Sequence, residues 1–118
     1  DMSEVYSNRL QDVIRNCAKE CDIELQEGVY VQFSGPNYET PSEVKMFRMF
    51  GADAVGMSTV PEVISAVHKG LKILAFSVIS NLGTGLTAEI QNHQDVLKQV
   101  EKSSEKLEHL LKTYLKEY

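Results

Sequence analysis

The sequence predicts an α/β fold in which helices cover a largely parallel sheet. Short apolar runs alternate along its 118 residues with stretches of helical spacing, in the order α-β-α-β-α-β-α. The longest apolar run, residues 71–79, is typical of a strand covered on both faces. Two of the expected helices also begin on a threonine with a proline close behind, which favours a sharp change from extended chain to helix.

The first half of the chain holds two expected helices with a strand between them. Residues 3–20 are predicted to form an amphipathic helix, because apolar side chains recur there at helical spacing. These side chains are Val5, Leu10, Val13, Ile14, Cys17 and Cys21, the last just beyond the helix. A strand is expected over residues 29–33. A second helix should run over residues 40–51, since Thr40 and Glu43 have the spacing of a capping box.

The second half repeats this alternation. We expect a short strand over residues 53–57, a helix over 59–70 that is capped by Thr59, a strand over 71–79, and one long helix from about residue 93. The order predicts a three-layer α/β/α sandwich with a mixed, largely parallel sheet. Three strands leave long apolar edges, which proteins normally cover or pair. Further sheet is therefore expected from outside this sequence.

Composition limits the classes of function. The chain has 17 acidic and 12 basic residues, a net charge of −5 and no basic cluster, which argues against nucleic acid as a partner. No apolar run approaches the roughly 20 residues of a membrane helix, and the first residues do not resemble a signal peptide. We therefore expect a cytoplasmic protein without a membrane partner. Cys17 and Cys21 have a spacing that suits a metal half-site or a redox pair, but no second Cys pair accompanies them, so core packing is favoured.

Two polar side chains stand where a strand should hand over to a loop or helix, the edge at which α/β proteins bind ligands. Glu39 lies just before the second helix, and Asn81 follows the longest apolar run. A carboxylate only accepts hydrogen bonds, whereas an amide both donates and accepts, so together they could bind a ligand that carries both donors and acceptors. The competing interpretations are a carboxylate favoured by the helix dipole and a turn-forming asparagine.

Three stretches together resemble the trimeric purine nucleoside phosphorylases, and the resemblance covers essentially the whole chain. They are Gly35-Pro-Asn-Tyr-Glu-Thr40, Gly51-Ala-Asp-Ala-Val-Gly-Met-Ser-Thr-Val-Pro-Glu62 and Ser80-Asn81. By residue matches, the resemblance implies purine contacts at Tyr38, Glu39, Val55, Ser80 and Asn81, ribose contacts at Met57 and His93, and a phosphate contact at Ser58. It makes Asn81 the nearest thing to a catalytic group. Ser80 stands where many relatives have threonine, which keeps the hydroxyl.

The resemblance also implies what the protein does. The expected activity is reversible phosphorolysis of inosine, guanosine and their deoxy forms to free base and (deoxy)ribose 1-phosphate, in purine salvage. Inorganic phosphate is the co-substrate, and no cofactor or metal is expected. Relatives of this kind are homotrimers. Residues 1–118 match only the C-terminal part of a single domain, without the Gly-rich phosphate loop of its N-terminal half, so the isolated chain is expected to be inactive.

Other interpretations stay open on the sequence alone. The chain could belong to an enzyme like the methylthioadenosine phosphorylases, or act as a non-catalytic binding or assembly module. Residues 83–88 fit the pattern G-x-G-x-x-G/A after an apolar run, which is the context of a dinucleotide fingerprint, but no second strand with an acidic end follows. The charged tail over residues 101–118 is most simply a solvated helix face, with a coiled coil as the alternative.

Overall fold

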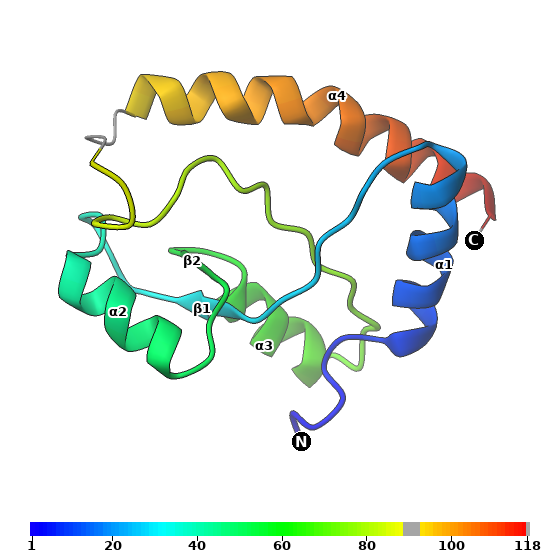
Figure 1. The fold of residues 1–118 in the computed structure, drawn as a ribbon. Coiled ribbons are helices and arrows are strands. Elements are labelled where there is room, and N and C mark those ends of the chain that lie inside the picture. The colour runs from blue at the N-terminus through cyan, green and yellow to red at the C-terminus, as the bar shows by residue number, and fades with distance from the viewer. Residues whose placement is uncertain (89–92, 118) are drawn as a thin grey trace. The chain divides into compact units, whose positions relative to one another are not determined.

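The structure, a computed structural model, describes residues 1–88 and 93–117, without the side chains of residues 93, 95 and 102. Its elements are α1 (Asn8–Glu20), β1 (Tyr30–Gln32), α2 (Pro41–Met49), β2 (Ala54–Gly56), α3 (Val60–His68) and α4 (His93–Glu117), shown in Figure 1. They belong to two compact units. Unit 1 comprises residues 1–26, 59–77 and 101–118, and unit 2 comprises residues 27–58 and 78–100. The predicted α/β class is confirmed, with the parallel sheet in unit 2.

The core of unit 1 is formed where α1 packs against the last part of α4. Its buried side chains are Ile14, Cys17, Ala18 and Leu110. Partly buried apolar residues from the same unit surround them: Val13, Ile23, Leu25, Leu74, Phe76 and Tyr114. The apolar stripe that predicted the first helix therefore faces this core, because side chains three and four residues apart share one helix face.

The start of α1 differs from the prediction. The helix begins at Asn8 instead of near residue 3, because the chain before it is held in another way. Tyr6 forms a parallel bridge with Ile73, and the Ser7 N–H donates to the Ile73 carbonyl at 3.0 Å. The Ser7 hydroxyl then caps the helix by accepting from the Leu10 N–H at 3.4 Å. Bonding to a distant segment thus displaced the helix start, which periodicity alone does not detect.

The sheet of unit 2 consists of two parallel strands. β1 pairs with β2 so that Val31 lies opposite Val55. Asp53 fixes this register at the start of the pair: its carboxylate accepts from the Val29 N–H at 2.8 Å, and its own N–H donates to the Val29 carbonyl at 2.8 Å. α2 packs beside the strands, with the ring of Phe47 edge-on to Phe33 at a centroid distance of 5.5 Å.

The third predicted strand, over residues 71–79, is wrong for the described structure. Within this run only Ile73 pairs with another segment, through the bridge to Tyr6. A strand requires a neighbour that takes its backbone hydrogen bonds along several residues. Apolar composition predicts burial and extension, but it does not show whether such a neighbour is present in the same chain.

The first three helices end in the same way. In each, the residue after the C-cap has a left-handed backbone: Asp22 with φ 53°, Gly51 with φ 89° and Gly70 with φ 72°. After α1, the Ile23 N–H also closes back onto the Ala18 carbonyl at 2.8 Å. These are Schellman ends, which satisfy carbonyls that the helix leaves open. The predicted stops at Gly51 and Gly70 are confirmed. Of the three left-handed residues, only Asp22 has a side chain, and this backbone conformation disfavours one.

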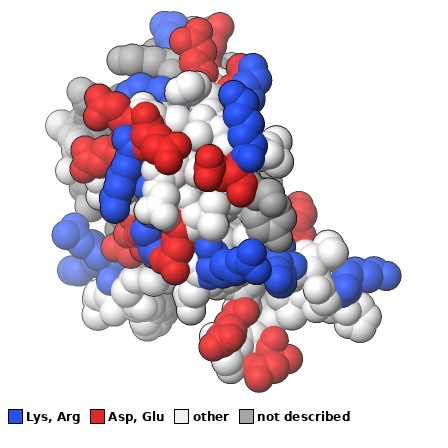
Figure 2. All heavy atoms as spheres, turned by 90° about the vertical axis from the view of Figure 1, so that its right-hand side faces the viewer, with Lys and Arg blue, Asp and Glu red and all other residues white. Residues whose placement is uncertain are grey.

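Charged side chains are mixed over the surface. Lys and Arg alternate with Asp and Glu on the face drawn in Figure 2. Along the helices of unit 1, Arg15 pairs with Asp12 at 2.7 Å and Lys112 with Glu108 at 2.6 Å. The Lys112 ammonium also lowers the pKa of Glu108 through its hydrogen bond and its charge. Across residues 1–88 and 93–117, no helix combines the length and the apolar character that crossing a bilayer requires.

Candidate active site

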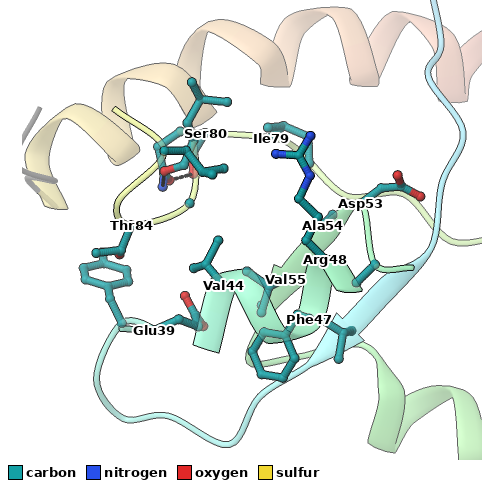
Figure 3. A pocket seen from close by; sticks show the side chains of 18 of the residues that line it. Glu39, Val44, Phe47, Arg48, Asp53, Ala54, Val55, Ile79, Ser80 and Thr84 are labelled. Carbon is teal, nitrogen blue, oxygen red and sulfur yellow. Dashed lines mark hydrogen bonds between the residues drawn. The ribbon is translucent and has the colours of Figure 1, made fainter. Parts of the chain in front are cut away.

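A cavity of about 650 Å³ lies within unit 2. Its walls come from the loop after β1, from α2, from β2 and from residues 78–86. Figure 3 shows Glu39, Val44, Val55 and Ser80 arranged around this space. Most of the side chains that the sequence predicted for the base and ribose line it: Tyr38, Glu39, Val55, Met57, Ser80 and Asn81. The cavity therefore gathers residues from three separate stretches of the chain.

Glu39 is the most unusual member of the cavity wall. The residue is only 7% exposed, and its Oε1 has no hydrogen-bond partner among the residues that the structure describes. Leaving a buried carboxylate oxygen without a partner costs free energy, and more so when the group is charged. A buried acceptor that faces a cavity therefore favours a ligand with an N–H or O–H donor at this position.

The helix that follows holds Glu39 in place. The Thr40 hydroxyl accepts from the Glu43 N–H at 3.3 Å, and the Glu43 carboxylate accepts from the Thr40 N–H at 2.7 Å. This is the reciprocal capping box that the sequence predicts, so that prediction is confirmed. The bond from the Thr40 backbone, followed by the one from its hydroxyl, holds the pKa of Glu43 below its usual value.

Asn81 is oriented by its own loop. Its Oδ1 accepts a hydrogen bond from the Ser80 hydroxyl at 2.5 Å, and its Nδ2 donates to the Leu82 carbonyl at 3.0 Å. A side-chain amide has two N–H donors and an oxygen that accepts two bonds, so these local bonds are compatible with contact to a purine. Ser80 thus acts on the same amide that the sequence assigned to the base.

Three further predicted residues give the cavity its apolar surface. Val55 comes from β2 and is partly buried, whereas Tyr38 and Met57 are 44% and 41% exposed. An aromatic ring, a branched aliphatic side chain and a thioether suit the flat faces of a purine and the carbon side of a sugar. Their exposure leaves apolar surface available for a ligand to cover.

Two predicted site residues need separate mention, because Ser58 is not among the described residues that line the cavity and the side chain of His93 is not described. Ser58 is exposed, and its backbone N–H donates to the Tyr30 hydroxyl at 3.3 Å. His93 is the first residue of α4, and its side chain lies outside the described part of the structure. The structure thus brings the base candidates and Met57 together, whereas Ser58, the phosphate candidate, does not line the cavity.

The expected cap at the start of α3 is also wrong. Thr59 makes no side-chain capping bond, and its backbone has φ 77°. An N-cap residue normally has an extended backbone, which aims the hydroxyl at the free N–H groups of the first turn. Positive φ is a rare conformation for a β-branched residue, and such strain gathers at functional sites. Thr59, which has this conformation, lies directly after Ser58.

The sequence did not point to several residues of the cavity wall. They are Val44, Phe47 and Arg48 from α2 and Thr84 from the following loop. Val44 and Phe47 follow Thr40 at helical spacing, so a capped helix at the site edge was the signal that could have identified them. Nothing in the sequence placed Thr84 at the site, because the course of a glycine-rich loop has no periodicity.

The glycine-rich run over residues 83–88 lacks the structure of a dinucleotide site. It makes a tight turn, in which the Leu86 N–H donates to the Gly83 carbonyl at 3.1 Å. No helix begins within this run, and the next described helix starts at His93. A dinucleotide fingerprint requires a helix N-terminus next to its glycines, where the pyrophosphate binds. The alternative that the pattern raised is therefore not supported.

The two cysteines behave as packing residues in unit 1. Cys17 is buried in the core, and burial, followed by the charges of Glu20 and Glu117, raises the pKa of its thiol. Cys21 is half-buried, and its sulfur lies 3.3 Å from the Thr113 hydroxyl. Among the side chains that the structure describes, no group of three or more His, Cys, Asp and Glu could hold a metal ion.

Comparison with known proteins finds a family profile and several similar enzymes. A sequence profile described as the Phosphorylase superfamily matches residues 1–116. The chain is 48% identical to purine nucleoside phosphorylase 1 of Geobacillus stearothermophilus over 102 residues, which cover 86% of this chain and 37% of that protein. It is 42% identical to purine nucleoside phosphorylase 1 of Bacillus subtilis, over 100% of this chain and 44% of that protein.

Solved structures agree with these matches. A Schistosoma mansoni purine nucleoside phosphorylase in complex with inosine aligns with a TM-score of 0.94 and 31% identity, over 100% of this chain and 43% of that one. Isoform 2 from the same organism, in complex with cytosine and ribose-1-phosphate, aligns with a TM-score of 0.90 and 43% identity, over 97% and 41%. The chain thus spans about two-fifths of the length of these relatives.

Proposed function

This chain belongs to the phosphorylase superfamily, and on that premise we propose that it forms part of a purine nucleoside phosphorylase. The proposed reaction is reversible phosphorolysis of a 6-oxopurine nucleoside or deoxynucleoside to free base and pentose 1-phosphate. Relatives named purine nucleoside phosphorylase, and neighbours solved with inosine, guanosine and hypoxanthine, support it. The observation that carries it is the buried Oε1 of Glu39 on the cavity wall, which has no hydrogen-bond partner among the described residues.

Glu39 selects the base in this proposal. The N1–H of hypoxanthine or guanine, and the 2-amino group of guanine, are donors that its carboxylate can accept. Adenine has an acceptor at N1, so its edge would face the carboxylate with a lone pair. A site with polar groups set for one hydrogen-bond pattern discriminates strongly against the inverse pattern, because buried groups are then left unpaired.

Asn81 stabilises the departing purine. As the glycosidic bond breaks, negative charge develops on the base, and N7 takes up a proton from water. The amide oxygen then accepts a hydrogen bond from N7–H, while the amide nitrogen donates one to the 6-oxo group. Ser80 orients this amide through its bond to Oδ1. The contact strengthens toward the transition state, which is the property that makes an interaction catalytic.

The other predicted residues complete the assignment. Tyr38 and Val55 contact the base, Met57 and His93 contact the ribose, and Ser58 contacts phosphate. We propose inorganic phosphate as the co-substrate, without a cofactor or metal, in a cytoplasmic homotrimer. The cavity holds one cationic side chain among the residues that the structure describes, Arg48, whereas a phosphate dianion needs several donors. Protein beyond these 118 residues supplies the rest of the phosphate site.

The test is a phosphate-dependent assay of the full-length protein that contains this chain. We expect hypoxanthine release from inosine only when phosphate is present, and much slower turnover of adenosine. The 118 residues alone should release no base. Adenosine or methylthioadenosine turnover equal to that of inosine would favour the methylthioadenosine phosphorylase-like alternative. Purine binding without any turnover by the full-length protein would favour a binding module.

A further inference from the structure

The loop after Asn81 lies tightly against the first turn of α2. At Gly83, a Cβ atom would lie 3.0 Å from Cγ1 of Val44. At Gly85, a Cβ atom would lie 2.7 Å from Cβ of Pro41, and the backbone has φ +81°, which disfavours other residues. The proline ring cannot rotate away, so any side chain at position 85 would push the loop off the helix. Both contacts lie within unit 2.

These contacts connect the segment that carries Glu39 with the loop that carries Asn81. Glu39 stands two residues before Pro41, and the capping box fixes the backbone between them. Asn81 stands two residues before Gly83, and the side chain of Asn81 is bonded within the same loop, to Leu82. Both polar residues line the same cavity. The packing of the loop on the helix therefore sets how far Asn81 stands from Glu39.

We propose that Gly83 and Gly85 are positioning residues that hold Asn81 at the right distance from Glu39 for a purine to bridge them. This rests on the proposed function. The two glycines explain the G-x-G pattern that resembles a dinucleotide fingerprint: close approach of the loop to a helix, instead of close approach to a pyrophosphate. Gly83 also lines the cavity, but in this proposal both glycines act through the placement of the amide.

The first test is Gly85→Ala in the full-length protein, with Gly70→Ala as its matched control. Gly70 has a similar backbone, φ +72°, but a Cβ there would meet no atom within 4 Å, and it lies in unit 1. Both variants acquire the same kind of backbone strain, and only Gly85→Ala displaces the loop. We expect kcat/KM for inosine to fall about 10- to 100-fold in Gly85→Ala, as for misplacement by up to 1 Å. Gly70→Ala should keep the wild-type value, and the KM for phosphate should change in neither variant.

The second test is a double-mutant cycle at Gly83. Gly83→Ala should lower kcat/KM for inosine, because the new methyl group crowds Val44. In a Val44→Ala background the same substitution should have little effect, since the crowded methyl groups are gone. Coupling of this kind between contacting residues shows that the contact, and not glycine flexibility, carries the effect. Equal losses in both backgrounds would contradict the proposal.

Amide hydrogen exchange gives a readout that does not depend on activity. The Leu86 N–H is bonded to the Gly83 carbonyl, so Gly85→Ala should speed its exchange while Gly70→Ala should not. If the wild-type protein is active and Gly85→Ala matches Gly70→Ala in kcat/KM and in Leu86 exchange, the positioning role is refuted and the proposed function stands. If the wild-type protein shows no phosphorolysis, the proposed function fails and the purine bridge fails with it.

Discussion

Replacing Glu39 by glutamine should change stability and activity in opposite directions. The two side chains have the same size, but the glutamine is neutral, and one carboxylate oxygen becomes an NH₂ donor. In the protein without ligand, Oε1 of Glu39 is buried and has no partner among the described residues, so removal of its charge relieves a desolvation cost. We expect the free energy of unfolding to rise, by about 1 kcal/mol, because a buried polar atom without a partner costs more when it is charged than when it is neutral.

Activity should fall for the same structural reason. A hydrogen bond to a charged group contributes roughly 1.5–3 kcal/mol, and its loss corresponds to a fall of about 10- to 150-fold in kcat/KM for inosine. If the new NH₂ group faces the purine N1–H, donor meets donor and the loss is larger. The assay is steady-state phosphorolysis of inosine by the full-length protein, combined with urea unfolding of the same samples.

Glu43→Gln is the matched control, because the same chemical change occurs four residues further on. Glu43 is partly exposed, and its carboxylate is satisfied by the Thr40 N–H and hydroxyl. We expect a slight loss of stability and an unchanged kcat/KM. A Glu39→Gln protein with wild-type kcat/KM would refute the role of Glu39 in base binding. One that unfolds more easily would refute the claim that burial of the charge at Oε1 costs stability in the free protein.

Three further results are expected. Asn81→Ala should lower kcat by about 10²- to 10³-fold and kcat/KM with it. Met57→Ala removes a contact present before and during reaction, so it should mainly raise KM for inosine. An Asn81→Ala enzyme with wild-type kcat would leave Asn81 as a turn former. Burial raises the pKa of the Cys17 thiol. The contribution of this thiol to stability is therefore complete below the ordinary thiol pKa of about 8.5 and is lost as pH rises toward its pKa in the folded protein. Unfolding curves from pH 7 to 10 should show this fall, and Cys17→Ala should abolish it. Asp22→Gly should stabilise unit 1 by about 0.5–1 kcal/mol, because glycine adopts φ 53° without strain; unchanged urea midpoints would contradict it.

Local chemistry explains most of what could be predicted from the sequence. The Thr40–Glu43 capping box and the stop at Gly51 depend on a few neighbouring residues, so their pattern was enough. Glu39 and Asn81 do line the same cavity, as the strand-end argument predicted, although the run before Asn81 forms no strand in the described structure. The run over residues 71–79 failed since strand formation depends on a distant partner.

Other parts of the site depend on packing that has no sequence period. Thr84 reaches the cavity because the loop lies on α2, and Thr59 fails to cap α3 because its backbone has φ 77°. A one-residue change in local backbone conformation decides whether a hydroxyl faces the first turn of a helix. Hydrophobic periodicity predicts neither of these features, so only the structure shows them.

The hydrogen bonds between Asp53 and Val29 also determine which face of β2 turns toward the cavity. Successive residues of a strand point to opposite faces, so a slip by one residue would exchange the two faces of β2. Ala54, Val55 and Gly56 all line the cavity, and Val55 has the largest apolar side chain of the three, which such a slip would turn to the opposite face. Asp53 closes the pair at a single register, through its carboxylate at 2.8 Å from the Val29 N–H. Asp53 therefore determines which face of β2 carries Val55, and with it where the branched side chain of the cavity wall lies.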